Sequence, residues 1–219
     1  VLIYCRLIGN PKLALSLTKL LDRMVLFLAG IKIKAYGLEK IPGKQGRVYV
    51  ANHRSHVDGA ALFEILPGEI VFLIKKEVFK IPLVSFALRT MGMIEVDRGD
   101  HEAATASINR AVSAIQSGHS VILFPEGTRS RQDTILPFKK GAFVLAIKSG
   151  ADVVPITLIG ADALLKPDTL FLYPGEVEIY IHDPIPTAGL VLEDRDSLLA
   201  KAQEAVEDKF EEEKAKPAS

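Results

Sequence analysis

A histidine and an aspartate five positions apart, His53 and Asp58, are the residues of this chain best suited to acid–base chemistry. In one continuous helix five residues turn the chain by roughly 500°, so the two side chains would diverge. They converge only if His53 lies in a turn and Asp58 in the first turn of the helix that follows. The strand-like run 47–51 and the helix-like run 59–66 predict this arrangement. An imidazole oriented by a carboxylate can accept a proton at neutral pH.

The same run also fits a purely structural motif. Ser55 would be the N-cap of the helix, and Asp58, three positions later, would complete a capping box. That alternative accounts for Ser55 and Asp58 but gives no role to His53.

Three further segments place polar residues beside apolar runs. Arg98 ends Gly92-Met93-Ile94-Glu95-Val96-Asp97-Arg98, Phe124-Pro125-Glu126-Gly127-Thr128-Arg129-Ser130 follows the run 120–123, and Val154-Pro155-Ile156-Thr157 begins another strand-like run. Together with Asn52-His53-Arg54-Ser55-His56-Val57-Asp58, these blocks resemble the glycerolipid acyltransferase family, which includes lysophosphatidate acyltransferases. The resemblance spans residues 49–160, about half of the chain, and shows no departure within the four blocks.

The resemblance implies that His53 is a general base and that Asp58 orients it. A nucleophilic third member is not predicted, because the chain has no Gly-x-Ser-x-Gly motif and its single cysteine, Cys5, lies in the N-terminal segment. The acceptor hydroxyl would therefore attack directly, without an acyl-enzyme. His56 with His53 is weak evidence for a metal site, so no metal is expected. No cofactor is expected either, because the acyl-CoA or acyl-carrier protein thioester is already activated.

Arginine suits phosphate because its guanidinium donates two parallel hydrogen bonds. The resemblance implies that Arg98 binds phosphate and that Glu126 and Arg129 help to hold a glycerol phosphate acceptor. The residues alone leave open a surface pairing of Arg98 with Asp97 or Asp100, and a structural ion pair between Glu126 and Arg129. The predicted substrate-binding set, in which the two lysines are the weaker candidates, is Arg98, Glu126, Gly127, Thr128, Arg129, Lys75 and Lys76.

Composition narrows the class of protein. The 219 residues carry no net charge, so the chain as a whole does not have the composition of a nucleic-acid-binding protein. One cysteine excludes an intrachain disulfide and fits a reducing compartment. The mean hydropathy of +0.22 is high for a soluble protein and indicates membrane contact.

Strand-like and helix-like runs alternate from residue 33 onward. Strands are predicted at 33–36, 48–51, 70–74, 93–96, 121–124, 153–158 and 177–181, and helices at 59–66, 83–90, 102–116, 141–149 and 197–213. This order predicts an α/β fold with a mixed, largely parallel central sheet flanked by helices.

Residues 12–28 are predicted to form an amphipathic helix, leucine-rich on one side and basic on another. The first 34 residues hold six basic residues and one acidic residue, a net of +5. The run is too short and too charged for a confident transmembrane span, and it suits a helix at the membrane interface. We expect residues 1–32 to be an N-terminal amphipathic, membrane-interfacial segment and 33–219 an α/β acyltransferase domain. A helix packed on its own domain is the alternative.

The leading hypothesis is an acyltransferase that moves a fatty acyl group from acyl-CoA or acyl-carrier protein to the sn-2 hydroxyl of 1-acyl-glycerol 3-phosphate (lysophosphatidate), giving phosphatidate. The enzyme would be monotopic at the cytoplasmic face of a membrane, with membrane lipid as its partner and no nucleic acid. Three alternatives stay open: another acceptor (glycerol 3-phosphate, another lysophospholipid or an amino-acid lipid), a non-catalytic lipid-binding protein, or a thioesterase.

Overall fold

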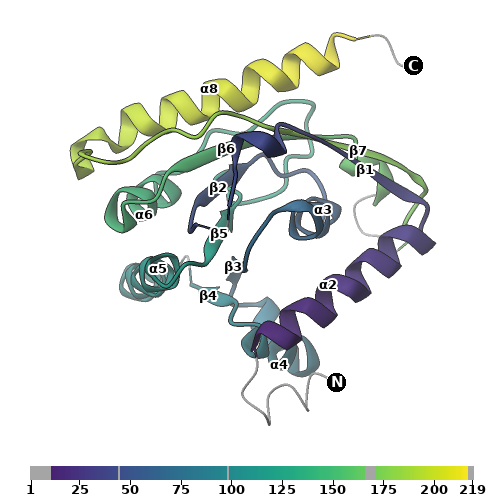
Figure 1. The fold of residues 1–219 in the computed structure, drawn as a ribbon, viewed down its shortest axis with the longest axis horizontal. Coiled ribbons are helices and arrows are strands. Elements are labelled where there is room, and N and C mark those ends of the chain that lie inside the picture. Colours follow the sequence, from purple (N-terminus) through teal and green to yellow (C-terminus); the bar gives the residue numbers. More distant parts are fainter. Residues whose placement is uncertain (1–10, 44, 98, 166–170, 217–219) are drawn as a thin grey trace.

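The computed structural model describes residues 11–43, 45–97, 99–165 and 171–216, and within them the strands form one seven-stranded sheet (Figure 1). The strand order is β1-β7-β6-β2-β5-β3-β4. The strands are β1 Ile31–Tyr36, β2 Val48–Ala51, β3 Ile70–Lys75, β4 Ile94–Val96, β5 Ser120–Leu123, β6 Val153–Ile159 and β7 Gly175–Ile181. Only β6 and β7 pair antiparallel within the described sheet. The predicted fold class is confirmed.

Helices cover both faces of the sheet, as Figure 1 shows. The helices are α2 Pro11–Leu28, α3 Val57–Ile65, α4 Pro82–Thr90, α5 His101–Gln116, α6 Gly141–Ser149, α7 Ala161–Leu164 and α8 Arg195–Lys214. Val48 and Val50 of β2 belong to the core beneath α5, α6 and α8, whereas Tyr49 and Ala51 belong to the core beneath α2 and α3. Alternate residues of a strand point to opposite faces. The central strand β2 is therefore buried on both sides.

Two local differences from the predicted elements have simple physical reasons. Strand β1 begins at Ile31, two residues early, because alternating Lys32 and Lys34 on an exposed edge hide the apolar signal. It therefore includes the last two residues of the predicted segment 1–32, and the domain boundary itself stays a prediction. The four-residue helix α7 was not predicted, because one helical turn shows no periodicity.

Helix α2 lies against α3 and β1 (Figure 1). Ala14, Leu15 and Leu26 are its buried residues, so the predicted leucine-rich stripe is not the packed face along the whole helix. Large apolar side chains in its second half remain exposed, namely Leu20, Leu21, Met24, Val25, Phe27 and Leu28. Among the described residues, no helix combines the length and apolar character that crossing a bilayer requires.

Candidate active site

The His53–Asp58 pair forms as the sequence predicts. His53 lies in the turn between β2 and α3, and its Nδ1 is 2.8 Å from Oδ2 of Asp58 in the first turn of α3. Asp58 is fully buried, whereas His53 is partly exposed. No described residue hydrogen-bonds the other ring nitrogen, Nε2, of His53. That nitrogen is therefore the atom that can take a proton from a substrate.

The Asp58 carboxylate also holds the backbone of the turn. Its Oδ2 accepts hydrogen bonds from the amides of Arg54 (2.7 Å) and Ser55 (2.8 Å), and the Ser55 hydroxyl accepts a longer one from Val57 N (3.3 Å). The predicted N-cap is wrong, because α3 begins at Val57 with His56 as its N-cap and without a side-chain capping hydrogen bond; the Asp58 carboxylate instead closes the turn and orients His53. Oδ1 of Asp58 is buried with no partner among the described residues.

Strand β5 brings the Glu126 block beside His53. Strands β2 and β5 are parallel neighbours, with Val50 opposite Leu123, so the turns after them meet at the carboxyl edge of the sheet. Oε1 of Glu126 accepts a hydrogen bond from His53 N (2.6 Å), and Oε2 accepts one from Leu136 N (2.9 Å). Glu126 is 2% exposed, and this burial raises the pKa of its carboxyl group.

Two further contacts fix the His53 ring and its backbone. The ring stacks on Phe124, with centroids 4.0 Å apart and an interplanar angle of 17°. The amide of Ser130 donates a 2.8 Å hydrogen bond to the His53 carbonyl. His53 is thus bounded by the Phe124–Ser130 block along its ring and at its amide and carbonyl groups.

Sequence reasoning missed two residues of the first block that position the site. The Asn52 amide bridges to β6, donating to the Leu158 carbonyl (2.9 Å) and accepting from the Leu158 amide (2.7 Å). Arg54 lies over the ring of Phe210 (5.4 Å) and forms ion pairs with Asp133 (3.2 Å) and Asp162 (2.8 Å). Their hydrogen-bond partners lie 79 to 108 residues away, and Phe210 lies farther still, so local sequence gives no signal for these contacts.

Arg129 is the predicted anion ligand that remains available. It is partly exposed and forms no ion pair with any residue that the structure describes, so the alternative Glu126–Arg129 ion pair does not form there. Burial, and then the charge of Arg129, lower the pKa of His56. Thr128 is exposed, and Gly127 has a φ of 77°, which favours glycine. The predicted contact of Glu126 with substrate stays a prediction, since both its oxygens accept backbone amides.

Two of the other predicted cations, Lys75 and Lys76, lie at the end of β3. Lys76 is bonded to Asp97, and Lys75 is exposed with Glu77 3.5 Å away. Because β3 pairs with β5, both lysines belong to the same sheet edge as His53. Arg98 lies outside the described residues. Within the described ranges, no three His, Cys, Asp or Glu side chains cluster in a way that could hold a metal ion.

An apolar cavity of about 210 Å³ adjoins the site. Phe124, which stacks on His53, is part of its wall, together with the ends of β3, β4 and β5 and residues of α5 and α6. Its apolar lining is formed mainly by Leu73, Val96, Ile108, Leu123, Phe124 and Ala142. A cavity of this character suits a hydrocarbon chain.

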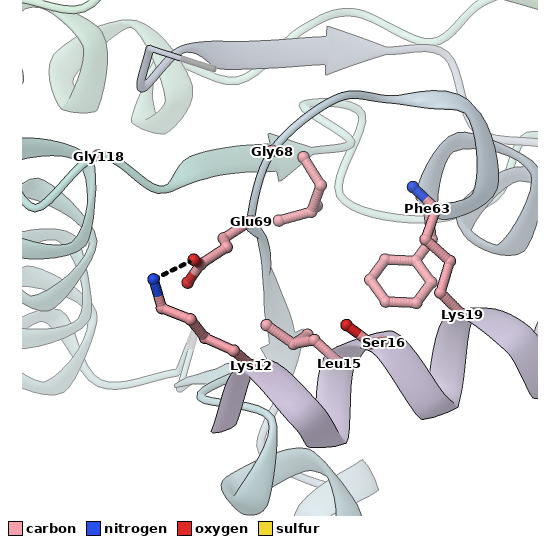
Figure 2. A pocket seen from close by; sticks show the side chains of 9 residues that line it. Lys12, Leu15, Ser16, Lys19, Phe63, Gly68, Glu69 and Gly118 are labelled. Atoms are coloured by element: carbon pink, nitrogen blue, oxygen red, sulfur yellow. Dashed lines mark ion pairs between the residues drawn. The ribbon is translucent and has the colours of Figure 1, made fainter. Parts of the chain in front are cut away.

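A larger cavity of about 350 Å³ lies elsewhere, between α2 and the amino ends of β3 and β5 (Figure 2). Lys12 and Glu69 form an ion pair (2.8 Å) at one end of it, and Lys19 and Phe63 line its other end. The parallel strands that it adjoins lead away from it toward His53. Size alone therefore does not locate the chemistry in this protein.

A histidine base held by a buried carboxylate at the carboxyl edge of an α/β sheet, beside a partly exposed arginine and an apolar cavity, defines a site suited to proton abstraction next to an anionic, apolar substrate. The sequence profile of the family described as Acyltransferase matches residues 32–159, more than half of the chain. The protein belongs to this acyltransferase family.

Similar proteins from several kingdoms are named 1-acyl-sn-glycerol-3-phosphate acyltransferases. The chain is 38% identical over 156 residues to the chloroplastic 1-acyl-sn-glycerol-3-phosphate acyltransferase BAT2 of Brassica napus, covering 70% of this chain but only 45% of that protein. It is 31% identical over 189 residues to the 1-acyl-sn-glycerol-3-phosphate acyltransferase of Borreliella burgdorferi, covering 86% of this chain and 76% of that protein.

A solved structure matches the fold closely. The crystal structure of the 1-acyl-sn-glycerophosphate acyltransferase PlsC from Thermotoga maritima superposes with a TM-score of 0.81 at 27% identity. The match covers 95% of this chain and 83% of that one.

Proposed function

We propose that this protein transfers a fatty acyl group from an acyl thioester, carried by CoA or by acyl-carrier protein, to the sn-2 hydroxyl of 1-acyl-glycerol 3-phosphate, giving phosphatidate. The observation that carries the proposal is the His53–Asp58 pair, whose Nε2 is left unbonded by the described residues. The names and the fold of the relatives support the acceptor class.

The reaction would proceed in one transfer. His53 Nε2 accepts the hydroxyl proton as the acceptor oxygen bonds to the thioester carbonyl carbon; the C–S bond then breaks and the thiolate recovers the proton from the imidazolium. Asp58 keeps the ring oriented throughout. The hydroxyls of Ser55 and Ser130 bond to backbone groups, which supports attack by the acceptor itself.

The acceptor has two chemical ends, and the site offers a match to each. The guanidinium of Arg129, together with Arg98, would hold the phosphate with charged, two-pronged hydrogen bonds. The apolar cavity behind Phe124 would take a hydrocarbon chain from donor or acceptor. Lys75 and Lys76 are the weaker phosphate candidates, because Lys76 already pairs with Asp97.

A panel of donors and acceptors, followed by mass spectrometry of the products, tests the reaction. We expect phosphatidate from lysophosphatidate, and no product when glycerol 3-phosphate replaces it. Acylation of glycerol 3-phosphate, but not of lysophosphatidate, would show that glycerol 3-phosphate is the acceptor. Rapid thioester hydrolysis without any acceptor would favour the thioesterase alternative, and a trapped covalent acyl adduct on the protein would overturn the direct transfer.

We also propose that α2 docks into one leaflet at the cytoplasmic face without crossing it. The exposed apolar residues of α2 support this docking. An enzyme held at the bilayer surface also avoids moving the acceptor's acyl chain into water, which would cost about 0.8 kcal/mol per CH₂ group. Liposome flotation would test it with Leu21→Asp/Met24→Asp. Lys201→Asp on the exposed face of α8 is the matched control, because it changes the net charge by the same −2. Equal flotation of the two variants would rule out the anchoring role of α2.

A further inference from the structure

Two segments distant in sequence expose large apolar side chains at one corner of the molecule. Phe27 and Leu28, at the end of α2, are 79% and 77% exposed, and Phe171 is 76% exposed. The segments are joined because the Gly175 amide donates a 3.2 Å hydrogen bond to the Gly30 carbonyl. Phe27, Leu28, Phe171 and Tyr173 are called the apolar corner below.

Residues 171–173, called the Phe171 segment below, are held so that the two aromatic side chains are exposed. Leu172 forms an isolated antiparallel bridge with Leu165 and packs against the core, and the Tyr173 amide donates a 2.8 Å hydrogen bond to the Leu164 carbonyl. In extended backbone, neighbouring side chains point to opposite sides. Phe171 and Tyr173 are therefore exposed because Leu172 is anchored inward.

An exposed lysine lies close in sequence to the end of α2. Lys32, the second residue of β1, is exposed and forms no ion pair with any described residue. The next outward lysine on the strand, Lys34, is already paired with Glu176 at 2.7 Å. Exposed apolar side chains, with a basic residue on the strand that follows α2, match the chemistry of a membrane interface that contains anionic lipids.

We infer that the apolar corner is a second membrane contact, built from the end of α2 and the Phe171 segment together. The inference rests on the proposed function, which makes the acceptor a membrane lipid. The contact would also orient the active site. The Phe171 segment is bonded to α7, and Asp162 of α7 forms the ion pair with Arg54 beside His53. Insertion of Phe171 would thus hold the catalytic edge of the sheet at a fixed height above the bilayer.

The sequence allows a clean optical test, because the chain contains no tryptophan. Phe171→Trp places a single indole at the corner, and Val191→Trp places one at a 56% exposed site before α8 as a matched control. Both full-length variants are mixed with vesicles of phosphatidylcholine alone or with added phosphatidylglycerol, and some vesicles carry brominated acyl chains.

We expect vesicles to shift the Phe171→Trp emission to the blue and brominated chains to quench it, more strongly with phosphatidylglycerol, while Val191→Trp is unchanged. An unchanged Phe171→Trp spectrum in protein that floats with the vesicles would overturn the inference. So would emission that is already blue-shifted before vesicles are added. If that shift grows with protein concentration, a second copy of the chain covers the corner; if it does not, the chain itself covers it.

A second variant separates this inference from the proposed function. Phe171→Ser should weaken vesicle binding on the order of tenfold, which is about 1.4 kcal/mol, and lower turnover of vesicle-borne lysophosphatidate but not of a water-soluble short-chain acceptor. If vesicles shift the Phe171→Trp emission to the blue but the protein acylates no acceptor, the proposed function is contradicted and the membrane contact at the apolar corner is supported. Acylation with no spectral shift would contradict the corner alone.

Discussion

The side chains around His53 and those on the outer face of α2 differ in how many partners they have within the protein. Around His53, carboxylate oxygens of Asp58 and Glu126 accept five short hydrogen bonds from backbone amides and the imidazole. On α2, apolar side chains face outward over its second half, and ionic contacts to the rest of the molecule lie along its edge, such as Arg23 with Glu64 at 2.5 Å.

This difference indicates what each region requires from outside the protein. The protein's own groups hold the His53–Asp58 pair, so its geometry does not depend on a bound substrate. Within the described part of the chain, the apolar side chains on the outer face of α2 remain exposed, and their burial in a lipid phase would stabilise the protein. Variants in the two regions should therefore fail in different assays.

The largest effect is expected at the base. His53→Ala should lower turnover by about 10²–10⁴-fold, because it removes the proton acceptor, while stability changes little. Steady-state kinetics on purified protein would measure this, with thermal unfolding as the control for folding. Asp58→Asn should also slow the reaction, since an amide can stabilise the wrong tautomer. Near-normal turnover of His53→Ala would sink the assigned mechanism.

Removal of an arginine that binds the acceptor phosphate should have a smaller effect, and this effect should be seen in the KM of the acceptor only. Arg129→Ala and Arg98→Ala should each raise the acceptor KM by an amount that corresponds to about 1.5–3 kcal/mol, the value of a charged hydrogen bond. Lys76→Ala should change it less, because Lys76 is already paired with Asp97. Acceptor and donor kinetics at saturating co-substrate distinguish the two sites. A change in the donor KM alone would show that the substituted arginine binds the donor and not the acceptor.

The buried carboxylate beside His53 should affect stability and activity together. Glu126→Gln places an amide N–H₂ against one of two backbone N–H donors, which should cost about 1–3 kcal/mol of unfolding free energy. Denaturant unfolding would measure this cost, and Glu178→Gln in β7 serves as control, because that carboxylate accepts from the Tyr36 and Tyr180 hydroxyls rather than from backbone amides. An unchanged unfolding midpoint would show that the Glu126 bonds contribute nothing net to the site.

The smallest effect should appear on α2 and depend on pH. Burial, and then the nearby charge of Glu64, raise the pKa of Asp22 to about 6 from its usual 3.8, against the opposing charge of Lys19. Because the folded state holds this proton more tightly, its stabilising contribution is present below the unfolded value and is lost as pH rises through about 6.

Asp22→Asn cannot ionise, so above that pH it should be more stable than the natural protein. The gain should be on the order of 1 kcal/mol, since solvent screening of a half-exposed group reduces what the shift alone implies. Unfolding free energies measured below and above this window, with exposed Asp208→Asn as control, would test the sign. A constant difference across the window would contradict the raised pKa.

Local parts of the structure were predictable because local geometry fixes them. His53 and Asp58 are five residues apart, so one turn and one helix start determine whether they meet. Strand β2 and helix α6 have the predicted bounds, Val48–Ala51 and Gly141–Ser149, because both are short apolar runs bounded by polar or turn-forming residues. The predicted roles of His53 and Asp58 and of the substrate-binding residues stay predictions.

The sequence by itself determined the pairing of His53 with Asp58, the alternation of strands and helices, and the family, because side-chain periodicity and turn geometry act over a few residues. Only the tertiary structure decided what surrounds the pair. Glu126 meets the His53 amide across 73 residues, and Arg54 meets Asp162 across 108, because the order of strands in the sheet brings those turns together. The same packing chose which apolar residues of α2 are covered and which, with Phe171, stay outside.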